Sequence, residues 1–395
     1  QNFTTATASN NTAVGYEAGR STTTGIDNVL YGSNAGYALT DADDNVALGR
    51  SALATDTLGS KSTAVGNGAL NAQNFTTATD TYNTAVGYAA GNDVTTGTGN
   101  TLIGAAAGDV LTDGDSNVAV GLAALGSDTR GNFSVAIGVA ALNSSNTTND
   151  TNMYNVAVGH HAGTAVTTGT HNTLIGGLAG DAITTGASNV AVGYGALTTD
   201  DVGQWNVAIG RDALSAQNIA TAANTYNTAV GGAAGGAVTT GVSNTLIGGL
   251  SGDALTDADQ NVALGYAALS SDTLGSNSVA IGYAALVAQN FTTATNSYNT
   301  AVGASAGGAV TTGVQNTIMG GLAGDALNTG ENNTAYGVSA LGADTKGDLS
   351  VAIGHSALSS QNFTTNTDSY NVAVGASAGL SVTTGQRNVL VGGQA

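Results

Sequence analysis

Short stretches in which β-branched and small apolar residues alternate recur along the chain, and their starts are separated by seventeen or twenty-one positions. Each stretch opens with Asn or Ser, continues through alternating β-branched and small apolar residues, and closes on Gly, as in residues 278–282. Alternate side chains of an extended chain point to opposite faces, so Val279 and Ile281 share one face and Ala280 takes the other. The pattern predicts one short β-strand in each stretch.

The stretches are ordered at a second, longer period. The segment that opens at Asn11 returns at a constant spacing, at positions 83, 155, 227, 299 and 371. Each of these long repeats, seventy-two positions in length, holds three coils of seventeen and one of twenty-one. We number the places of a coil from its opening Asn or Ser, and Gly fills the fifth place in all 22 coils. We interpret residues 1–395 as one continuous solenoid cut from a longer repetitive chain, with a partial repeat (1–10), five full repeats (11–370) and another partial repeat (371–395).

A coil of this length without proline is too short for a helical hairpin and suits strands joined by tight turns. We therefore predict an all-β fold, a parallel β-solenoid or β-roll of about 22 coils. A second, weaker strand is expected about eleven residues after the first, as in residues 94–97 and 111–114. Coils that rise roughly 4.8 Å each make a stack on the order of 105 Å long. The fifth-place Gly suits a positive φ or a close backbone approach.

The opening Asn suits a ladder in which each side-chain amide bonds to the next coil, and the alternative is that Asn only tolerates the turn. The ladder hypothesis covers the first-place residues Asn11, Asn28, Asn45, Asn83, Asn100 and Asn117.

The third place is Ala in most coils, but a larger residue stands there in the second coil of every repeat. These residues are Leu30, Leu102, Leu174, Leu246, Ile318 and Leu390. We favour an intermolecular interface on this face over a role in the chain's own core. An Ala280→Arg change is then expected to disrupt assembly far more than a change at Asp272.

The longer fourth coil of each repeat holds four extra residues, which we expect to protrude as a loop. Phe75, Phe291, Phe363 and Ile219 stand in these loops. We expect them to tuck against the roll, because an exposed Phe row would promote aggregation.

Composition excludes several partners and chemistries. With 7 Lys and Arg against 26 Asp and Glu, the formal net charge of −19 argues against nucleic acid and anionic membranes. No apolar run is long enough to span a membrane, so no direct membrane insertion is expected. The absence of Cys removes disulfides and thiol chemistry.

Few sites for chemistry stand out. Asp41 with Asp43, Asp113 with Asp115, and Asp257 with Asp259 resemble the start of a calcium loop, and we favour solvated acidic turns over calcium binding. Adjacent His160 and His161 should face opposite sides of a strand, which disfavours shared metal ligation. The recurring carboxylates Asp128, Asp200, Asp272 and Asp344 are interpreted as surface turns. We expect no enzyme and no cofactor, with calcium as the remaining alternative.

A resemblance adds to this interpretation. SVAIG at Ser134, Ser278 and Ser350, and NVAVG or NTAVG elsewhere, resemble the head repeats of YadA-like trimeric autotransporter adhesins along the whole chain. The resemblance implies a left-handed parallel β-roll, three chains around one axis, and binding to host matrix or surfaces. The same runs are also similar to repeats in the fibre proteins of tailed phages.

These observations predict a structural or adhesive extracellular fibre at the cell surface. It is expected to be a homotrimeric rod that projects or forms a surface appendage, with a host-surface or matrix receptor as partner. A tail-fibre shaft on a phage virion is the alternative. A monomeric calcium- or ice-binding solenoid is a third candidate, disfavoured for ice because the Val-Thr-Thr-Gly stretch recurs clearly only once in each long repeat.

Overall fold

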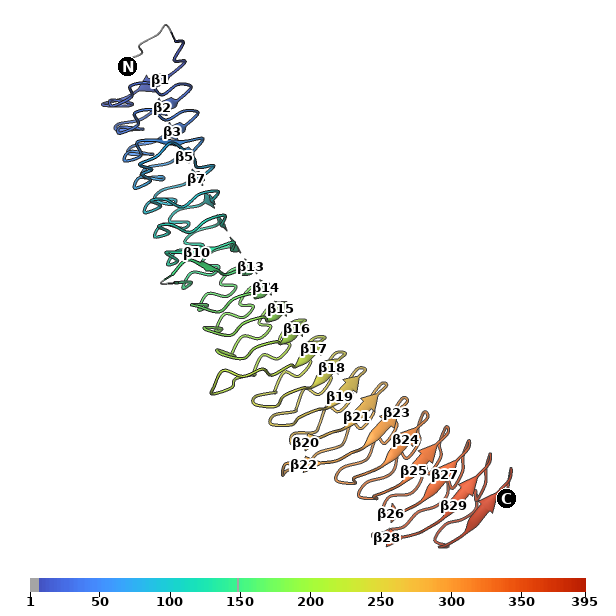
Figure 1. The fold of residues 1–395 in the computed structure, drawn as a ribbon. Coiled ribbons are helices and arrows are strands. Elements are labelled where there is room, and N and C mark those ends of the chain that lie inside the picture. The colour runs from blue at the N-terminus through green and yellow to red at the C-terminus, as the bar shows by residue number, and fades with distance from the viewer. Residues whose placement is uncertain (1–6, 148) are drawn as a thin grey trace. The chain divides into compact units, whose positions relative to one another are not determined.

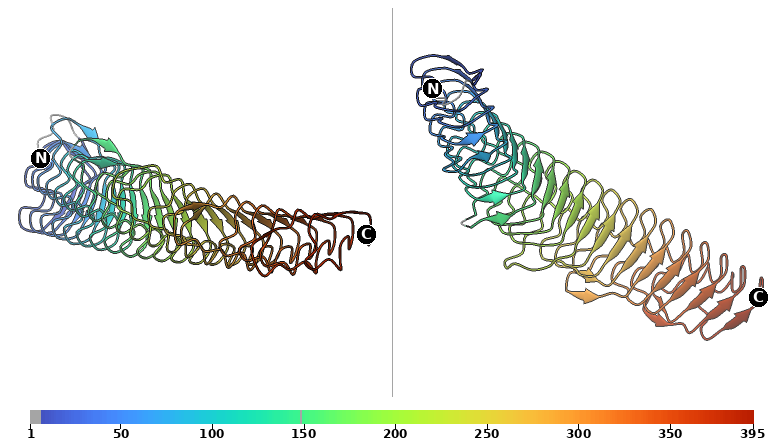
Figure 2. Two further views of the ribbon diagram at one scale, coloured as in Figure 1. Left: turned by 90° about the horizontal axis from the view of Figure 1, so that it is seen from below. Right: turned by 45° about the horizontal axis from the view of Figure 1, so that its top comes forward.

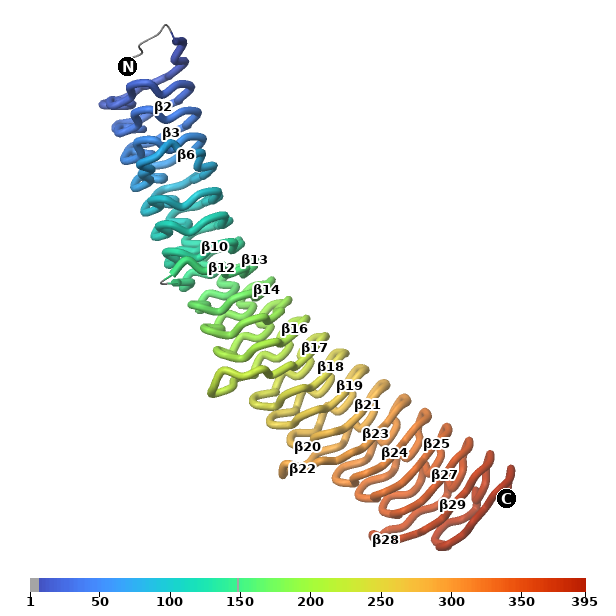
Figure 3. Tube along the Cα trace, in the orientation of Figure 1, coloured from blue at the N-terminus to red at the C-terminus, as the bar shows by residue number. Residues whose placement is uncertain are grey.

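The computed structural model describes residues 7–147 and 149–395, which form strands, turns and bends without a helix. The all-β parallel solenoid of about 22 turns is as predicted. The chain divides into two compact units, unit 1 (Gln1–Gly195) and unit 2 (Ala196–Ala395), and in each of them one coil follows directly on another (Figure 3). Within the described ranges, no helix could span a membrane. Of the expected partial repeat 1–10, residues 1–6 lie outside the described part.

Each coil contributes one three-residue strand to a long parallel ladder, and each unit holds eleven such strands among its described residues (Figure 1). In unit 1 they are β1 (Thr12–Val14), β2 (Val29–Tyr31), β3 (Val46–Leu48), β5 (Thr63–Val65), β7 (Thr84–Val86), β8 (Thr101–Ile103), β9 (Val118–Val120), β11 (Val135–Ile137), β13 (Val156–Val158), β14 (Thr173–Ile175) and β15 (Val190–Val192).

The strands of unit 2 lie side by side and run in one direction (Figure 2). They are β16 (Val207–Ile209), β17 (Thr228–Val230), β18 (Thr245–Ile247), β19 (Val262–Leu264), β21 (Val279–Ile281), β23 (Thr300–Val302), β24 (Thr317–Met319), β25 (Thr334–Tyr336), β27 (Val351–Ile353), β29 (Val372–Val374) and β30 (Val389–Val391).

Equivalent places of neighbouring coils pair with each other. In β7 and β8 Ala85 stands opposite Leu102, one short coil further on. Where a longer fourth coil intervenes, in β11 and β13, Ala136 stands opposite Ala157. Because the pairing follows coil length, the third place of one strand always meets the third place of the next.

A glycine closes each strand because the next coil passes too close for a side chain. Gly121 has a φ of +135°, and a Cβ on it would lie 2.5 Å from the carbonyl oxygen of Gly138 in the following coil. Both the backbone conformation and the contact exclude an L-residue with a side chain. The two explanations that the sequence offered for this place, a positive φ and a close approach, therefore hold together.

The expected second strand is wrong for residues 94–97 and 111–114, which form bends. The N–H groups of Thr95, Thr96 and Gly97 all donate to the one carbonyl of Thr112, at 2.8, 3.3 and 3.2 Å. Three donors on one acceptor curl the backbone, so no extended ladder forms there.

A second ladder does occur in the described residues, as two-residue strands that join a third coil to the inserted loop of the fourth. The pairs are β4 (Gly59–Ser60) with β6 (Thr79–Asp80), β10 (Gly131–Asn132) with β12 (Thr151–Asn152), β20 (Gly275–Ser276) with β22 (Thr295–Asn296), and β26 (Gly347–Asp348) with β28 (Thr367–Asp368).

The core of each unit is filled by alternating large and small residues at the third and ninth places. Leu102 is fully buried, and its methyl groups lie where a side chain on Gly91 or Gly108 would begin, 2.6 and 2.8 Å from an added Cβ. In the third and fourth coils of a repeat Ala stands at the third place and Leu at the ninth, as Ala119 and Leu125 do. The first coil has small residues at both places, Ala at the third and Gly at the ninth, and a methyl group of Leu102 from the next coil lies over Gly91. The interior is thus filled at close packing.

The intermolecular interface expected at the third place is wrong. The larger third-place residues are buried inside a single chain, at 0 or 1% exposure, because the strand turns this face inward; they are Leu30, Leu102, Leu174, Leu246 and Ile318. Leu390, in the last coil, is half-buried. Ala280 is likewise fully buried, so Ala280→Arg would disrupt the core of the chain itself.

The inserted loops of the fourth coils protrude, and their apolar residues tuck down as predicted. Phe75, Phe291 and Phe363 are 7, 5 and 5% exposed, and Ile219, which replaces Phe, is 7% exposed. The loop tip at residues 76–78 is exposed.

The fifth-place contact makes a direct prediction for stability. Gly121→Ala is expected to lower the free energy of unfolding by about 2–4 kcal/mol, because it combines a forbidden φ with a backbone clash. Gly177→Ala is the matched control in the same unit, since the nearest atom to its added Cβ is a Tyr194 ring carbon at 3.5 Å. Urea unfolding followed by circular dichroism measures both, and equal midpoints would contradict the close-contact account.

Candidate interaction surface

The outward face of the long ladder carries an apolar or aromatic side chain at the fourth place of every coil. Its second place is always Thr or Val and its fourth is Val, Ile, Leu, Tyr or Met. Ile103, Ile137 and Ile175 remain 39, 38 and 39% exposed at the fourth place of unit 1. Leu264 and Ile353 continue the pattern in unit 2 at 43 and 37%.

This outward face, defined by the second and fourth places, is continuous within each unit because registered strands stack equivalent residues. Ile103 stands opposite Val120, and Val120 opposite Ile137. The fourth place alone exposes on the order of 600 Å² in eleven coils, close to the roughly 800 Å² that each partner buries in a stable interface. Soluble monomers seldom leave a contiguous apolar patch of this size uncovered.

The sequence analysis assigned the two faces of the strand the wrong way round: the third place is buried except in the first and last coils, and the second and fourth places are exposed or half-buried. The signal that separates the faces is the relation between third and ninth places, since the second coil of each full repeat has Leu or Ile with Gly, and the third and fourth coils have Ala with Leu. Residues that exchange size in this way pack against each other, whereas Thr and Val at the second place vary without such an exchange.

The first-place Asn residues form a ladder whose bonds run to the backbone. Asn83 Oδ1 accepts the N–H of Asn100 at 2.9 Å, and Asn100 Oδ1 accepts the N–H of Asn117 at 2.9 Å. The Nδ2 of Asn100 donates back within its own coil to the carbonyl of Gly114 at 2.8 Å. The same links connect Asn11 with Asn28, and Asn28 with Asn45. Each amide therefore ties the start of a coil to its end and to the next coil.

A row of Thr at the thirteenth place forms a second ladder that the sequence reasoning missed. Thr95 Oγ1 donates to the carbonyl of Thr112 at 3.1 Å, and Thr112 Oγ1 donates to the carbonyl of Thr129 at 2.8 Å. Its signal was a Thr that recurs in most coils whatever its neighbours are. These hydroxyls are engaged within the chain.

The carboxylates interpreted as surface turns lie in the core, so that interpretation is wrong. Asp128, Asp200, Asp272 and Asp344 are all fully buried at the twelfth place of a third coil. Their burial is offset by hydrogen bonds, as buried charge requires.

Asp272 shows how the chain satisfies such a carboxylate. Its Oδ1 accepts the N–H groups of Gly275 and Phe291, each at 3.1 Å, and its Oδ2 accepts Gln289 Nε2 at 2.6 Å. The Oε1 of Gln289 in turn accepts Asn299 Nδ2 at 2.9 Å, which joins this network to the Asn ladder. In the equivalent network burial raises the pKa of Asp200, and the bonds from Gln217 and Gly203 partly oppose that rise.

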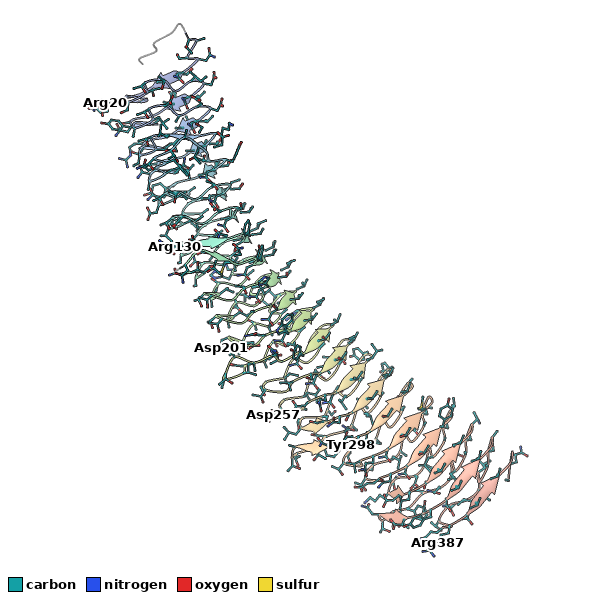
Figure 4. All side chains as sticks on the ribbon, in the orientation of Figure 1. Arg20, Arg130, Asp201, Asp257, Tyr298 and Arg387 are labelled. Atoms are coloured by element: carbon teal, nitrogen blue, oxygen red, sulfur yellow. The ribbon has the colours of Figure 1, made fainter. Side chains whose placement is uncertain are left out.

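The acidic pairs considered for calcium accept hydrogen bonds from the preceding coil. Asp43 Oδ1 accepts the N–H of Ile26 at 2.8 Å, Asp115 Oδ1 that of Thr98 at 2.7 Å, and Asp259 Oδ1 that of Val242 at 2.8 Å. Their partners Asp41, Asp113 and Asp257 lie on the turns at or near the surface, and Figure 4 shows Asp257 on the outside of unit 2. In the described part of the chain no three His, Asp or Glu side chains cluster as metal ligands would.

His160 and His161 lie side by side, contrary to the strand argument. Their ring centroids are 4.2 Å apart, because the strand ends before them, at Val158, and His161 adopts a left-handed backbone with φ of 57°. A third histidine, His171, packs against Tyr154, with ring centroids 5.3 Å apart and ring planes tilted by 37°.

In some coils the corner that precedes the strand carries an exposed aromatic side chain. Phe133 and Tyr154 stack at 5.3 Å with ring planes 7° apart. Lys61 lies 5.5 Å from the centre of the Tyr82 ring, and its 2.6 Å bond to Asp80 lowers the pKa of that carboxyl. Figure 4 shows Tyr298 at this corner of unit 2. The corner is polar and interrupted, unlike the outward face.

No family model matches the chain, and no curated protein matches it.

The buried network predicts a stability difference between two carboxylates. Asp272→Ala is expected to lower the free energy of unfolding by about 2–4 kcal/mol, because it leaves the Gln289 amide and two backbone N–H groups without their acceptor. Asp257→Ala, on an exposed turn of the same unit, should cost less than about 1 kcal/mol. Urea denaturation measures the free energy of unfolding of both variants. Equal losses would show that the hydrogen-bond network around Asp272 does not stabilise the chain.

Proposed function

We propose that the chain is the shaft of an extracellular fibre and that copies of it associate through their outward faces. The single observation that carries the proposal is the continuous exposed apolar face of the long ladder. The exposed apolar side chains of this face repeat at the spacing between coils. A second copy of the same chain has the same spacing, so the two faces can match along the full length of a unit. The stoichiometry of three and the surface display rest on the resemblance to adhesin head repeats.

Charge supports a structural role of this kind. No acidic residue stands at the second or fourth place of any coil, so the outward face itself carries no charge. The remaining negative surface keeps assembled fibres soluble and separate. Because each coil contacts only its neighbours, coils can be added to such a fibre without destabilising the coils already present.

The mass in solution tests the proposal. The wild-type chain is expected to have three times its 38.1 kDa monomer mass by light scattering. Ile103→Lys combined with Ile137→Lys places two charges on the outward face of each copy, and should shift the mass towards 38.1 kDa with an unchanged circular dichroism spectrum.

Ile103→Thr with Ile137→Thr is the matched control, since Thr already stands on the outward face at the second place. It should retain the assembled mass at micromolar concentration. A wild-type mass of one chain, or a Lys variant that assembles as well as the wild type, would refute association through this face.

A further inference from the structure

A polar hollow in unit 1 breaks the repeat. It has a volume of about 240 Å³ and is open to solvent, and it lies between the sixth- and tenth-place columns. Its polar and aromatic lining comprises Arg50, Asn67, Asn71, Tyr88 and Asn92. These residues come from three successive coils, and backbone bonds between the coils fix their order, with the Ala89 N–H donating to Asn67 O at 2.9 Å.

Three of the five side chains, those of Arg50, Asn67 and Asn92, are not kept one repeat further on. There Leu122 replaces Arg50, Val139 replaces Asn67 and Thr164 replaces Asn92. A solenoid needs none of the three for its own packing, because the neighbouring repeat folds without them. Convergent polar residues that interrupt a repeat indicate a ligand site.

The hollow exists because Gly68 has no side chain. Gly68 stands at the seventh place with a φ of 70°, where most coils carry a larger residue, and a Cβ on it would approach the Oδ1 of Asn92 to 3.3 Å. The Nδ2 of Asn92 is held by Asp93 at 2.6 Å, so the Oδ1 of Asn92 faces the hollow as an acceptor. This geometry suits a hydroxyl donor.

Arg50 supplies the charge of the site. Within the described residues no carboxylate lies within 4.0 Å of its guanidinium, whereas Arg20, Arg130 and Arg211 each have an acidic partner. The amides of Asn67 and Asn71 likewise bond to no other described side chain, and they offer donors and acceptors together. The Tyr88 ring, 67% exposed, presents an apolar face beside them.

We propose that this hollow binds one sugar residue that carries a carboxylate. The planar guanidinium of Arg50 pairs with the carboxylate in a bidentate geometry. The amides of Asn67, Asn71 and Asn92 bond the ring hydroxyls, and the ring lies on Tyr88. A volume of about 240 Å³ accommodates a single ring. The site does not depend on the fibre proposal.

Ligand-observed NMR titration of the full chain tests the site with two probes: methyl glucuronide and methyl glucoside. The glucuronide is expected to bind at least about ten-fold tighter than the glucoside. Arg50→Leu should abolish that preference, and Gly68→Ser should weaken the glucuronide about ten-fold by filling the hollow.

Neither substitution is expected to impair folding. Leu122 occupies the sixth place and Ser51 the seventh place in other coils, and Ser51 has a φ of 55°. Arg211→Leu, at a sixth place in unit 2, is the matched control and should bind as the wild type does. Equal binding of glucuronide and glucoside, or an Arg50→Leu variant that keeps its preference for the glucuronide, would overturn the proposal.

Discussion

The contact between fifth-place glycines of neighbouring coils is the constraint on which the rest of the structure depends. A side chain on Gly121 would collide with the carbonyl of Gly138, so the coils approach to backbone distance only where Gly stands. That approach holds the strands in register and lets the amide of Asn100 reach the next coil. The two faces of each strand, one packed and one exposed, follow from that register.

The longer period of the sequence has a physical origin in the core. The third coil of a repeat buries a carboxylate at its twelfth place, and the fourth coil supplies the polar partner, as Gln289 does for Asp272. A fourth coil with an apolar twelfth-place residue, such as Val310 of a first coil, would leave the carboxylate without that donor. The buried polar pair therefore requires that the third and fourth coils of a repeat differ from the first two.

The strand, the glycine and the tucked Phe75 could be predicted from the sequence because each depends on local spacing. The inward face of the strand could not be assigned from local spacing, since both faces are apolar and Ala280 alone does not say which lies inside; only the relation between third- and ninth-place residues separates the faces. The burial of Asp272 was missed because its donors, Gly275, Gln289 and Phe291, come together only once the coils stack. The hollow beside Arg50 also joins three coils, so no single stretch of sequence reveals it.

Distances between spin labels test the central claim, a constant step from coil to coil, most directly. The chain has no Cys, so introduced Cys residues are labelled uniquely. Asp44→Cys, Ser116→Cys and Ser188→Cys, introduced two at a time, lie at the seventeenth place of the second coil in three successive long repeats. Pulsed electron paramagnetic resonance on samples diluted with unlabelled chain should give about 19 Å for 44 with 116 and about 38 Å for 44 with 188. A second distance that is not close to twice the first would contradict the stacked-coil account.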